Sequence, residues 1–426
     1  MEALLVNLNK SLRDAHDALE GEYSQFRQES LQSADTLPNR KLLELATESI
    51  DLSDKLQRML QPPSSILAES FLGKNFPFRT MALSYNSHAT IAYIDTKCLW
   101  VAVSNDIPDR ISTGHHDIHQ LAQLAGLNVG GLRKVMQILC NNGIFTHDPV
   151  TDSYLHSPAS LLLTKDHWTQ WHNWTDLYGN EFYDICRSLP TSLKVGESRS
   201  AAQIEFSTEL SIFEYLQTRG LAHKFHQTLG GAAIAQAPGI VADYDWSSMG
   251  PDKVVLDIGG GVGDFLAALL RAHPTMRGAL LELDHVVEMA NQNFRAPGAK
   301  YADVADRVVD LHVGDFTAEV PRYEMYVIKW CLHNWDDELT VKILTNVRRA
   351  ITQTPESRLV IVEGVLAPGR SCRVSRYADI TMMVAVNGME RTRESWEGLA
   401  ERAGWRLQTV SPLRNAWCCA IDLRPA

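Results

Sequence analysis

Short apolar runs alternate with segments of helical periodicity over residues 251–426. The apolar runs are Val254–Ile258, Gly278–Leu283, Val308–Val313, Met325–Lys329 and Leu359–Glu363. Strands that alternate with helices through short connections are typical of a mostly parallel, doubly wound sheet with helices on both faces. We therefore predict an α/β fold here, with a ligand site at the carboxyl ends of the strands.

Residues 81–165 show a different pattern, with helices first and a hairpin last. We predict helices over Ala89–Val103, Ile118–Ala125 and Val129–Asn141, and a hairpin that includes Thr151–Leu155. Helix, turn, helix and hairpin in this order are typical of a winged helix, which either binds DNA or serves as a dimerisation or lid module. Because the second helix of the motif carries Arg133 and Lys134 but no dense basic cluster, we favour the second role.

The other two segments are predicted to be helical. Within residues 1–80, apolar residues recur at spacings of three and four, but the helices are too few to bury their own faces. We expect them to pack on a larger partner, such as a second subunit. Residues 166–250 are predicted to be linker helices, and their aromatic residues are interpreted as core. These aromatic residues are Trp168, Trp171, Trp174, Phe182, Tyr183 and Phe213.

Composition and charge narrow the function. The chain has 426 residues and a formal net charge of −11 at pH 7, and this acidic balance argues against nucleic acid as the main partner. Its seven cysteines include no C-x-x-C pair, which favours reduced thiols over disulfides or a zinc site. Since neither a leader-type N-terminus nor a membrane-spanning run is visible, we expect a cytoplasmic protein without a membrane partner.

A glycine-rich turn follows the first strand of the predicted sheet. The segment Asp257–Gly263 has the pattern D-x-G-x-G-x-G, with Gly259, Gly261 and Gly263 at the repeated positions. Glycines permit the tight turn and a close approach of a ligand to the backbone. A dinucleotide fingerprint is spaced G-x-G-x-x-G, and an acid at the strand end would repel a pyrophosphate. The same acid can hold the ammonium of an amino-acid moiety, which favours S-adenosylmethionine (SAM) over NAD.

Two further features follow the next strands in order. Glu282 ends the second strand, about twenty residues on, where an acid fits a ribose hydroxyl. Asp315 and Phe316 follow the third strand, where Asp can accept from an adenine amino group while Phe packs against the ring. Three features after three successive strands predict a SAM site.

The segment Lys329–Glu338 then has the pattern K-x-x-L-H-N-W-x-D-E. Together with Asp257–Gly263 and Glu282, it resembles the plant caffeic-acid-type O-methyltransferases and their fungal secondary-metabolite relatives, which are class I SAM-dependent enzymes. The resemblance implies a Rossmann-like SAM-binding catalytic domain at 251–426, linker helices that line the substrate pocket at 166–250, and a winged-helix-like domain at 81–165. It also implies that the winged-helix-like domain serves dimerisation and that the protein is a homodimer. The resemblance is weakest over residues 1–80, which we expect to be an N-terminal helical dimerisation segment because of their unburied apolar faces.

The resemblance also implies the roles of individual residues. His333 matches the general base, and the matching acids that flank it are Glu363 and Glu390. A neutral imidazole can take the proton of a phenol, and a carboxylate orients the ring and stabilises the imidazolium. No metal is needed, because the sulfonium supplies the electrophile. Lys329 is expected to line the cofactor site or to cap the strand end. The expected substrate-binding residues are Phe225, Thr228, Leu229, Trp330, Met383 and Asn387.

The chain also departs from the family pattern. Glu282-Leu283-Asp284 replaces Asp-Leu-Pro and keeps the acid, while Asn334 replaces the commoner Asp. The segment Phe225–Leu229 departs from the usual F-x-x-A-M type, so we expect an acceptor other than a simple phenylpropanoid.

Three functions remain open at this point. The first is an O-methyltransferase acting on a hydroxyl of an aromatic or polyketide-type secondary metabolite. The second resembles the fungal O-methyltransferase-like pericyclases, which keep SAM bound but catalyse dehydration and a Diels–Alder or ene-type cyclisation, with His333, Lys329 or Thr228 as hydrogen-bond donors. The third is a winged-helix DNA-binding regulator, against which the acidic charge and the complete cofactor motif count. We favour the first, because His333, Glu363 and Glu390 are all present.

Overall fold

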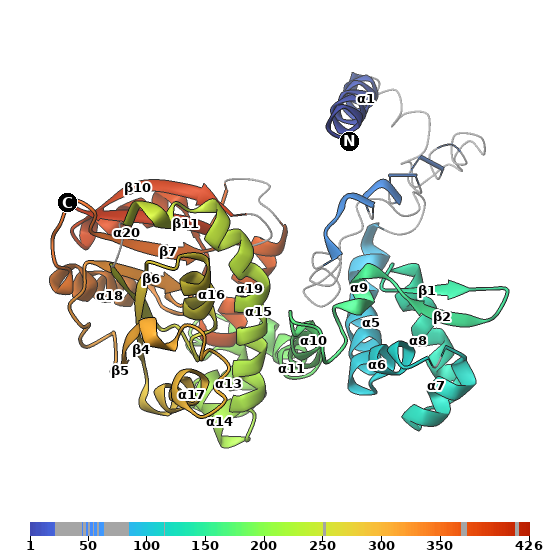
Figure 1. Ribbon diagram of the computed structural model, residues 1–426. Helices are drawn as coiled ribbons and strands as arrows, with labels where there is room; N and C mark the ends of the chain where they lie inside the picture. Colours follow the sequence, from blue (N-terminus) through green and yellow to red (C-terminus); the bar gives the residue numbers. More distant parts are fainter. Residues whose placement is uncertain are drawn as a thin grey trace.

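A seven-stranded sheet forms the centre of the C-terminal domain in the computed structural model, which describes residues 1–21, scattered positions between 45 and 63, 85–114, 116–249, 253–367, 373–413 and 417–426 (Figure 1). The strand order is β10-β11-β7-β6-β3-β4-β5. The strands are β3 (Val254–Ile258), β4 (Arg277–Glu282), β5 (Val308–Val313), β6 (Met325–Lys329), β7 (Arg358–Glu363), β10 (Trp405–Pro412) and β11 (Cys419–Pro425). The pairs from β5 to β7 are parallel, whereas β11 runs antiparallel to β7 and β10 antiparallel to β11.

The five predicted strands are therefore confirmed, but the sheet is mixed because of a C-terminal hairpin that the apolar runs did not indicate. The inner parallel strands β3, β4, β6 and β7 are covered on both faces, so they appear in the sequence as nearly continuous apolar runs, whereas β5 at the sheet edge is only partly buried. Strand β10 lies at the sheet edge and buries only part of its residues, so its sequence, WRLQTVSP, carries no such run.

Two layers of helices cover the sheet, as a doubly wound fold requires. One apolar core packs α15 (Ala222–Asp243), α16 (Asp264–Ala272) and α17 (Asp284–Arg295) against the sheet. A second core packs α18 (Asp337–Ala350) and α20 (Arg393–Arg402) against it. The carboxyl ends of the parallel strands lie between these layers, and the predicted cofactor and catalytic residues follow them.

The N-terminal part contains the predicted helices and hairpin. These elements are α5 (Tyr85–Ser104), α6 (Ile107–Ser112), α7 (Ile118–Ala125), α8 (Val129–Asn141), β1 (Phe145–Asp148) and β2 (Ser153–His156). The Asp117 side chain caps α7, Gly126 ends it with a φ of +66°, and the Asn128 side chain caps α8. These local signals set both helices at the predicted bounds.

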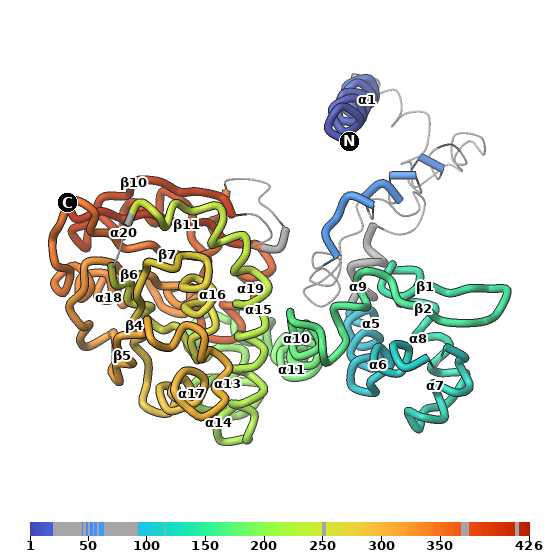
Figure 2. The backbone as a smooth tube through the Cα atoms, in the orientation of Figure 1, coloured from blue at the N-terminus to red at the C-terminus, as the bar shows by residue number. Residues whose placement is uncertain are grey.

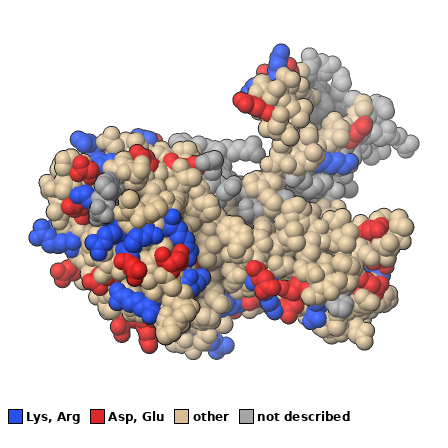
Figure 3. Space-filling view, viewed as in Figure 1, with Lys and Arg blue, Asp and Glu red and all other residues tan. Residues whose placement is uncertain are grey.

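Charged side chains on this part do not form a basic stripe on the visible face (Figure 3). Arg133 on α8 donates two hydrogen bonds of 2.9 Å to the Asp152 carboxylate, and His147 lies 2.9 Å from the same carboxylate. Arg133, one of the two cations on the second helix of the motif, is therefore already paired within the fold.

Helix α1 (Glu2–Gly21) confirms helical structure at the start of the chain, and its side chains are mostly exposed. Much of the predicted helical region up to residue 80 lies outside the described residues, including Tyr23. None of the helices among the described residues is long and apolar enough to cross a membrane.

Short helices connect the two parts, and Figure 2 shows the chain passing through them toward the sheet. They are α9 (Pro158–Leu161), α10 (Trp171–Gly179), α11 (Glu181–Ile185), η1 (Cys186–Ser188), α12 (Leu189–Ser192), α13 (Ala201–Glu205) and α14 (Ile212–Thr218). The remaining elements are η2 (Trp246–Met249), η3 (Ala305–Arg307), η4 (Leu332–Asn334), β8 (Val365–Leu366), α19 (Arg373–Val386) and β9 (Arg391–Thr392). Residues of α10, α11, α13 and α14 share an apolar core with Val384 and Ala385 of α19. This packing joins the linker helices to the catalytic domain.

Candidate active site

His333 lies at the carboxyl end of the sheet, in the turn η4 that follows β6. Because β6 and β7 are adjacent and parallel, Glu363 at the end of β7 lies beside this turn. Glu390 reaches it from the segment before β9. The Nδ1 atom of His333 lies 2.9 Å from Glu390 Oε1 and 3.2 Å from Glu363 Oε2. The structure thus brings together the three residues that the sequence predicts as catalytic.

Hydrogen bonds to the backbone hold the Glu363 carboxylate and the main chain at Glu390. Glu363 Oε1 accepts hydrogen bonds from the backbone N–H groups of Cys331, Leu332 and His333, at 2.8, 2.9 and 3.4 Å. The backbone N–H of Glu390 donates to Asp379 Oδ1 at 2.9 Å. The Glu363 carboxylate and the backbone at Glu390 therefore keep fixed positions beside the imidazole.

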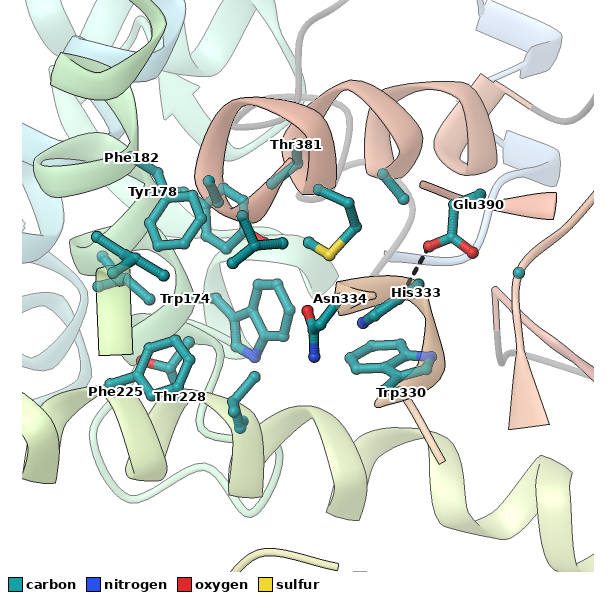
Figure 4. Close-up of a pocket in the computed structure, with 18 of the residues that line it drawn as sticks. Trp174, Tyr178, Phe182, Phe225, Thr228, Trp330, His333, Asn334, Thr381 and Glu390 are labelled. Carbon is teal, nitrogen blue, oxygen red and sulfur yellow. Dashed lines mark hydrogen bonds and ion pairs between the residues drawn. The ribbon is translucent and has the colours of Figure 1, made fainter. Parts of the chain in front are cut away.

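The environment of His333 makes it a stronger base than an ordinary histidine. Its burial works against the imidazolium, but the Glu363 charge and the Glu390 hydrogen bond outweigh burial, so the pKa of His333 is raised. Burial also raises the pKa of Glu363, and the His333 charge opposes that rise. Since Nδ1 faces the carboxylates, the other ring nitrogen, Nε2, points toward the neighbouring cavity (Figure 4). This arrangement can take a proton from a group in the cavity.

The same cluster has a composition that suits a divalent cation. Ligand-type atoms of His333, Glu363 and Glu390 all lie within 4.8 Å of one another. The charge of the two buried carboxylates can be neutralised by a proton shared with His333 or by a bound metal ion. A chelator would remove the metal ion but would not affect the proton.

The glycine-rich turn has the backbone geometry that only glycine adopts easily. Gly259, Gly261 and Gly263 have φ values of +66°, +60° and +89°. A Cβ atom on Gly263 would lie 2.3 Å from the Phe294 ring, and one on Gly260 would lie 2.4 Å from the Asp257 carboxylate. The glycines therefore allow both the turn and the close packing beneath it.

Asp257 lies beneath this turn and is fully buried. Neither carboxylate oxygen has a hydrogen-bond partner among the described residues. Burial raises the pKa of Asp257 to about 7, while the Lys329 charge opposes the rise. The buried Lys329 ammonium has a lowered pKa for the same reason, partly offset by Asp257. An unpaired carboxylate under an open glycine turn fits a cofactor with a cationic amino-acid end.

The two other predicted cofactor features lie next to the turn. Glu282 Oε1 accepts from the Gly261 N–H at 3.0 Å, and burial raises the pKa of Glu282. The backbone of Gly314, just before Asp315, donates to the Glu282 carbonyl, which brings the ends of β4 and β5 together. The Phe316 ring lies 3.6 Å from the position of a Cβ on Gly259. The structure thus gathers all three features at one edge of the sheet.

A second cavity lies beside the turn, next to the His333 pocket. Its walls are formed by Gly259–Val262, Asp264, Phe265, Lys329, Trp330 and four residues of α15, namely His226, Leu229, Gly230 and Ala233. Trp330 and Leu229 also line the His333 pocket. These two residues therefore mark where the cavity beside the glycine-rich turn meets the His333 pocket.

The His333 pocket is mostly apolar, and its empty volume of about 950 Å³ includes space that is open to solvent. Figure 4 shows His333, Trp330 and Asn334 on one side and Tyr178 and Phe182 on another. Helix α15 contributes Phe225 and Thr228, and α19 contributes Thr381. An apolar pocket with few polar groups suits an organic molecule.

Four of the six predicted substrate residues line this pocket, namely Phe225, Thr228, Leu229 and Trp330. Met383 and Asn387 do not. Met383 packs into the core that joins α19 to the linker helices, and Asn387 donates to the Ser198 carbonyl at 3.0 Å. Met382 lines the pocket instead, because neighbouring helical residues point about 100° apart.

The sequence did not indicate two features of the pocket, an aromatic wall and a strained residue. Trp174 and Phe182 are buried in apolar cores, as interpreted from the sequence, and together with Tyr178 they also form one aromatic wall of the pocket. Trp174 stacks on Tyr178 with ring centroids 5.0 Å apart, and Tyr178 stacks on Phe182 at 4.8 Å. Their spacing of four residues was the available signal. Trp330 has a φ of +51°, a strained value for a tryptophan that no sequence pattern announces.

Polar side chains other than the His333 cluster are largely engaged. The Thr228 hydroxyl lies 2.9 Å from the Lys224 carbonyl and 3.3 Å from that of Asn173. The Thr381 hydroxyl donates to the Tyr377 carbonyl at 2.8 Å. Lys329 lines the cofactor cavity, with its ammonium 4.9 Å from the centroid of the Trp330 ring. His333 is therefore the residue best placed to exchange a proton with a molecule in the pocket.

Several proteins that are similar to this chain in sequence or in fold are methyltransferases by name. Residues 197–406 match the O-methyltransferase domain family. The chain is 53% identical to O-methyltransferase verK of Clonostachys rogersoniana over the full length of both, and 42% identical to O-methyltransferase gliM of Aspergillus fumigatus over 99% of this chain and 94% of that one. CalO1, described as a methyltransferase in calicheamicin biosynthesis and solved with S-adenosylhomocysteine (SAH) bound, superposes with a TM-score of 0.69 at 25% identity, over 79% of this chain and 96% of CalO1.

The chain belongs to the O-methyltransferase family. It is an enzyme with a Rossmann-like methyltransferase fold, and its cofactor is SAM. Its named fungal relatives are O-methyltransferases as well.

Proposed function

We propose that the protein methylates a hydroxyl group of an aromatic or polyketide-type secondary metabolite, with His333 as the general base. The observation that carries this proposal is the buried cluster of His333, Glu363 and Glu390, which opens onto an apolar pocket beside the glycine-rich turn. Two similar proteins act on polycyclic molecules by their names, a phenazine O-methyltransferase of Lysobacter antibioticus and a mitomycin 7-O-methyltransferase.

The residues of this chain divide the work between them. SAM supplies the methyl group as an electrophile when it is bound. Glu282, Asp315, Phe316 and the glycine turn hold the cofactor, with Asp257 and Lys329 beneath and beside the turn. The aromatic wall and Trp330 orient the acceptor and exclude water. His333 accepts the proton of the acceptor hydroxyl at Nε2, and the carboxylates at Nδ1 stabilise the imidazolium that forms.

We also propose a role for each segment of the chain. We assign 1–80 and the winged-helix-like 81–165 to dimerisation, 166–250 to the pocket and 251–426 to catalysis, in a cytoplasmic homodimer. The exposed apolar side chains of α1, such as Leu4 and Leu19, support a partner for that helix. Sedimentation of the purified protein tests the dimer, and a variant that lacks residues 1–21 is expected to associate more weakly.

A pericyclase that keeps SAM without using its methyl group is the second candidate. It needs hydrogen-bond donors aimed at a substrate carbonyl. The pairing of the Thr228 hydroxyl with backbone carbonyls and the position of Lys329 in the cofactor cavity count against it. His333 is then the remaining candidate donor. Its raised pKa suits a general base and also, in the protonated imidazolium form, a hydrogen-bond donor.

One experiment separates the two candidates. The purified protein is incubated with methyl-labelled SAM and a panel of phenols, polycyclic aromatics, polyketides and pyridones. We expect label in one acceptor and an equal amount of SAH, and we expect His333→Ala to abolish both. Consumption of a substrate without label or SAH would overturn the proposal in favour of the pericyclase. His312→Ala, a change at a histidine on β5 bonded to Tyr323, is the matched control.

A further inference from the structure

The turn that carries His333 is enclosed by a second segment of the chain. We call residues 331–335 the catalytic turn. Met389 donates its backbone N–H to the His333 carbonyl at 2.9 Å. A Cβ atom on Gly388 would lie 2.1 Å from the same carbonyl oxygen, so only glycine lets the two backbones approach this closely. Residues 388–391 therefore pack directly on the catalytic turn.

Arg391 makes the most extensive contacts of this segment. Its guanidinium donates to the carbonyl of Leu332 at 3.1 Å and to the carbonyl of Trp335 at 2.7 Å, on either side of His333. It also donates to Thr340 Oγ1 at 3.2 Å and to Asp337 Oδ1 at 2.9 Å. The side chain is 1% exposed, although its ion-pair partner Asp337 is 51% exposed. A planar guanidinium can span two carbonyls in a way that an ammonium cannot.

These contacts complement those of Glu363. The Glu363 carboxylate accepts the N–H groups at the start of the catalytic turn, and Arg391 donates to its carbonyls. Glu390, the residue before Arg391, contacts the His333 ring. Strand β9 fixes Arg391 in turn, because it pairs with β8, just after Glu363. One short stretch of chain thus sets both the backbone and the ring of His333.

We propose that Arg391 is a positioning residue for the reaction: it holds the catalytic turn so that His333 keeps its contact with the two carboxylates and its aim into the acceptor pocket. The inference rests on the proposed role of His333 as the base. A displacement of about 1 Å in a reacting group can cost on the order of a hundredfold in rate, so the rigidity of this turn bears directly on turnover.

Arg391→Lys tests the proposal because it keeps the positive charge but cannot span both carbonyls. We expect kcat to fall about tenfold or more, while the Kd for SAM changes less than about twofold, since the cofactor turn is untouched. We also expect the acid limb of the kcat–pH profile to move to lower pH. A loosened turn lets His333 drift from Glu390, and its raised pKa then returns toward the ordinary value.

Two further variants keep the test independent of folding. Thr340→Val removes one acceptor of the guanidinium with little change of shape, and a smaller fall in kcat with the same direction of shift is expected. Arg402→Lys, which alters an exposed ion pair with Glu338 on α18, is the matched control and is expected to behave as the native protein. The proposal is overturned if the acid limb of the kcat–pH profile stays unshifted in both Arg391→Lys and Thr340→Val, and if any loss of activity equals the loss of folded protein.

His333→Ala distinguishes the failure of this inference from a failure of the proposed function. If His333→Ala retains methyl transfer, then His333 is not the base and the proposed function fails. If His333→Ala is inactive while Arg391→Lys has native kcat and a native pH profile, only the positioning role of Arg391 fails.

Discussion

Replacing Glu390 by Gln removes one negative charge beside His333 but keeps a side-chain oxygen that can accept the hydrogen bond from His333 Nδ1. Glu390 Oε1 lies 2.9 Å from His333 Nδ1, and both residues are buried. A hydrogen bond to a charged group contributes about 1.5–3 kcal/mol. Because Glu363 Oε2 remains 3.2 Å from the same nitrogen, we take the lower end. This corresponds to a fall of about one unit in the pKa of His333 and a loss of about tenfold in rate.

The kcat–pH profile from about pH 5 to about pH 9 measures both quantities. A base must be neutral to act, so the rate of the native enzyme rises with pH through the raised pKa of His333. In Glu390→Gln we expect this acid limb to move about one unit to lower pH and the plateau to fall about tenfold. Glu397→Gln, at an exposed position on α20, is the control. A lowered plateau with an unmoved limb would refute the reasoning, because the limiting ionisation would then belong to another group.

Four other outcomes follow from the geometry. Asp257→Asn is expected to weaken SAM binding by about tenfold or more in calorimetry, since the amide cannot pair with a cationic ligand. Gly263→Ala should lower the free energy of unfolding by about 2 kcal/mol or more, and Gly261→Ala by about 1 kcal/mol, because only the first Cβ would clash. Thr228→Val should change kcat less than about twofold, since its hydroxyl already contacts backbone carbonyls; a large loss would favour the pericyclase. A chelator should leave the rate unchanged. A loss of rate that a divalent cation restores would instead indicate a metal ion at His333, Glu363 and Glu390.

Much of the fold was predictable because its signals are local. The parallel strands β3, β4, β6 and β7 are mostly buried and the helices α7 and α8 carry side-chain caps, so apolar runs and caps marked their bounds. The hairpin β10–β11 was missed because an edge strand in partial contact with solvent has no unbroken apolar run. The helical prediction for residues 1–80 is confirmed for α1.

The candidate site was predictable to the extent that its residues belong to motifs. His333, Glu363 and Glu390 were each predicted from a separate segment of the chain, and the structure brings the three segments together. The pocket walls were harder, because a wall residue and a core residue have the same apolar side chains. The core interpretation of Trp174 and Phe182 is confirmed, but the sequence did not indicate that they also line the pocket, and Met383 was expected where Met382 lies.

By itself, the sequence determined that a glycine turn with Asp257 follows the first parallel strand and that Glu282 and Asp315 follow the next two. Such features depend on a few neighbouring residues and on the fixed direction of parallel strands. Only the tertiary structure decided what surrounds them: that both carboxylates meet the same nitrogen of His333, that Asp257 lies beneath the turn, and that Arg391 holds the catalytic turn. These facts depend on the rotation of helices and the distance between segments far apart in the chain, which no local pattern contains.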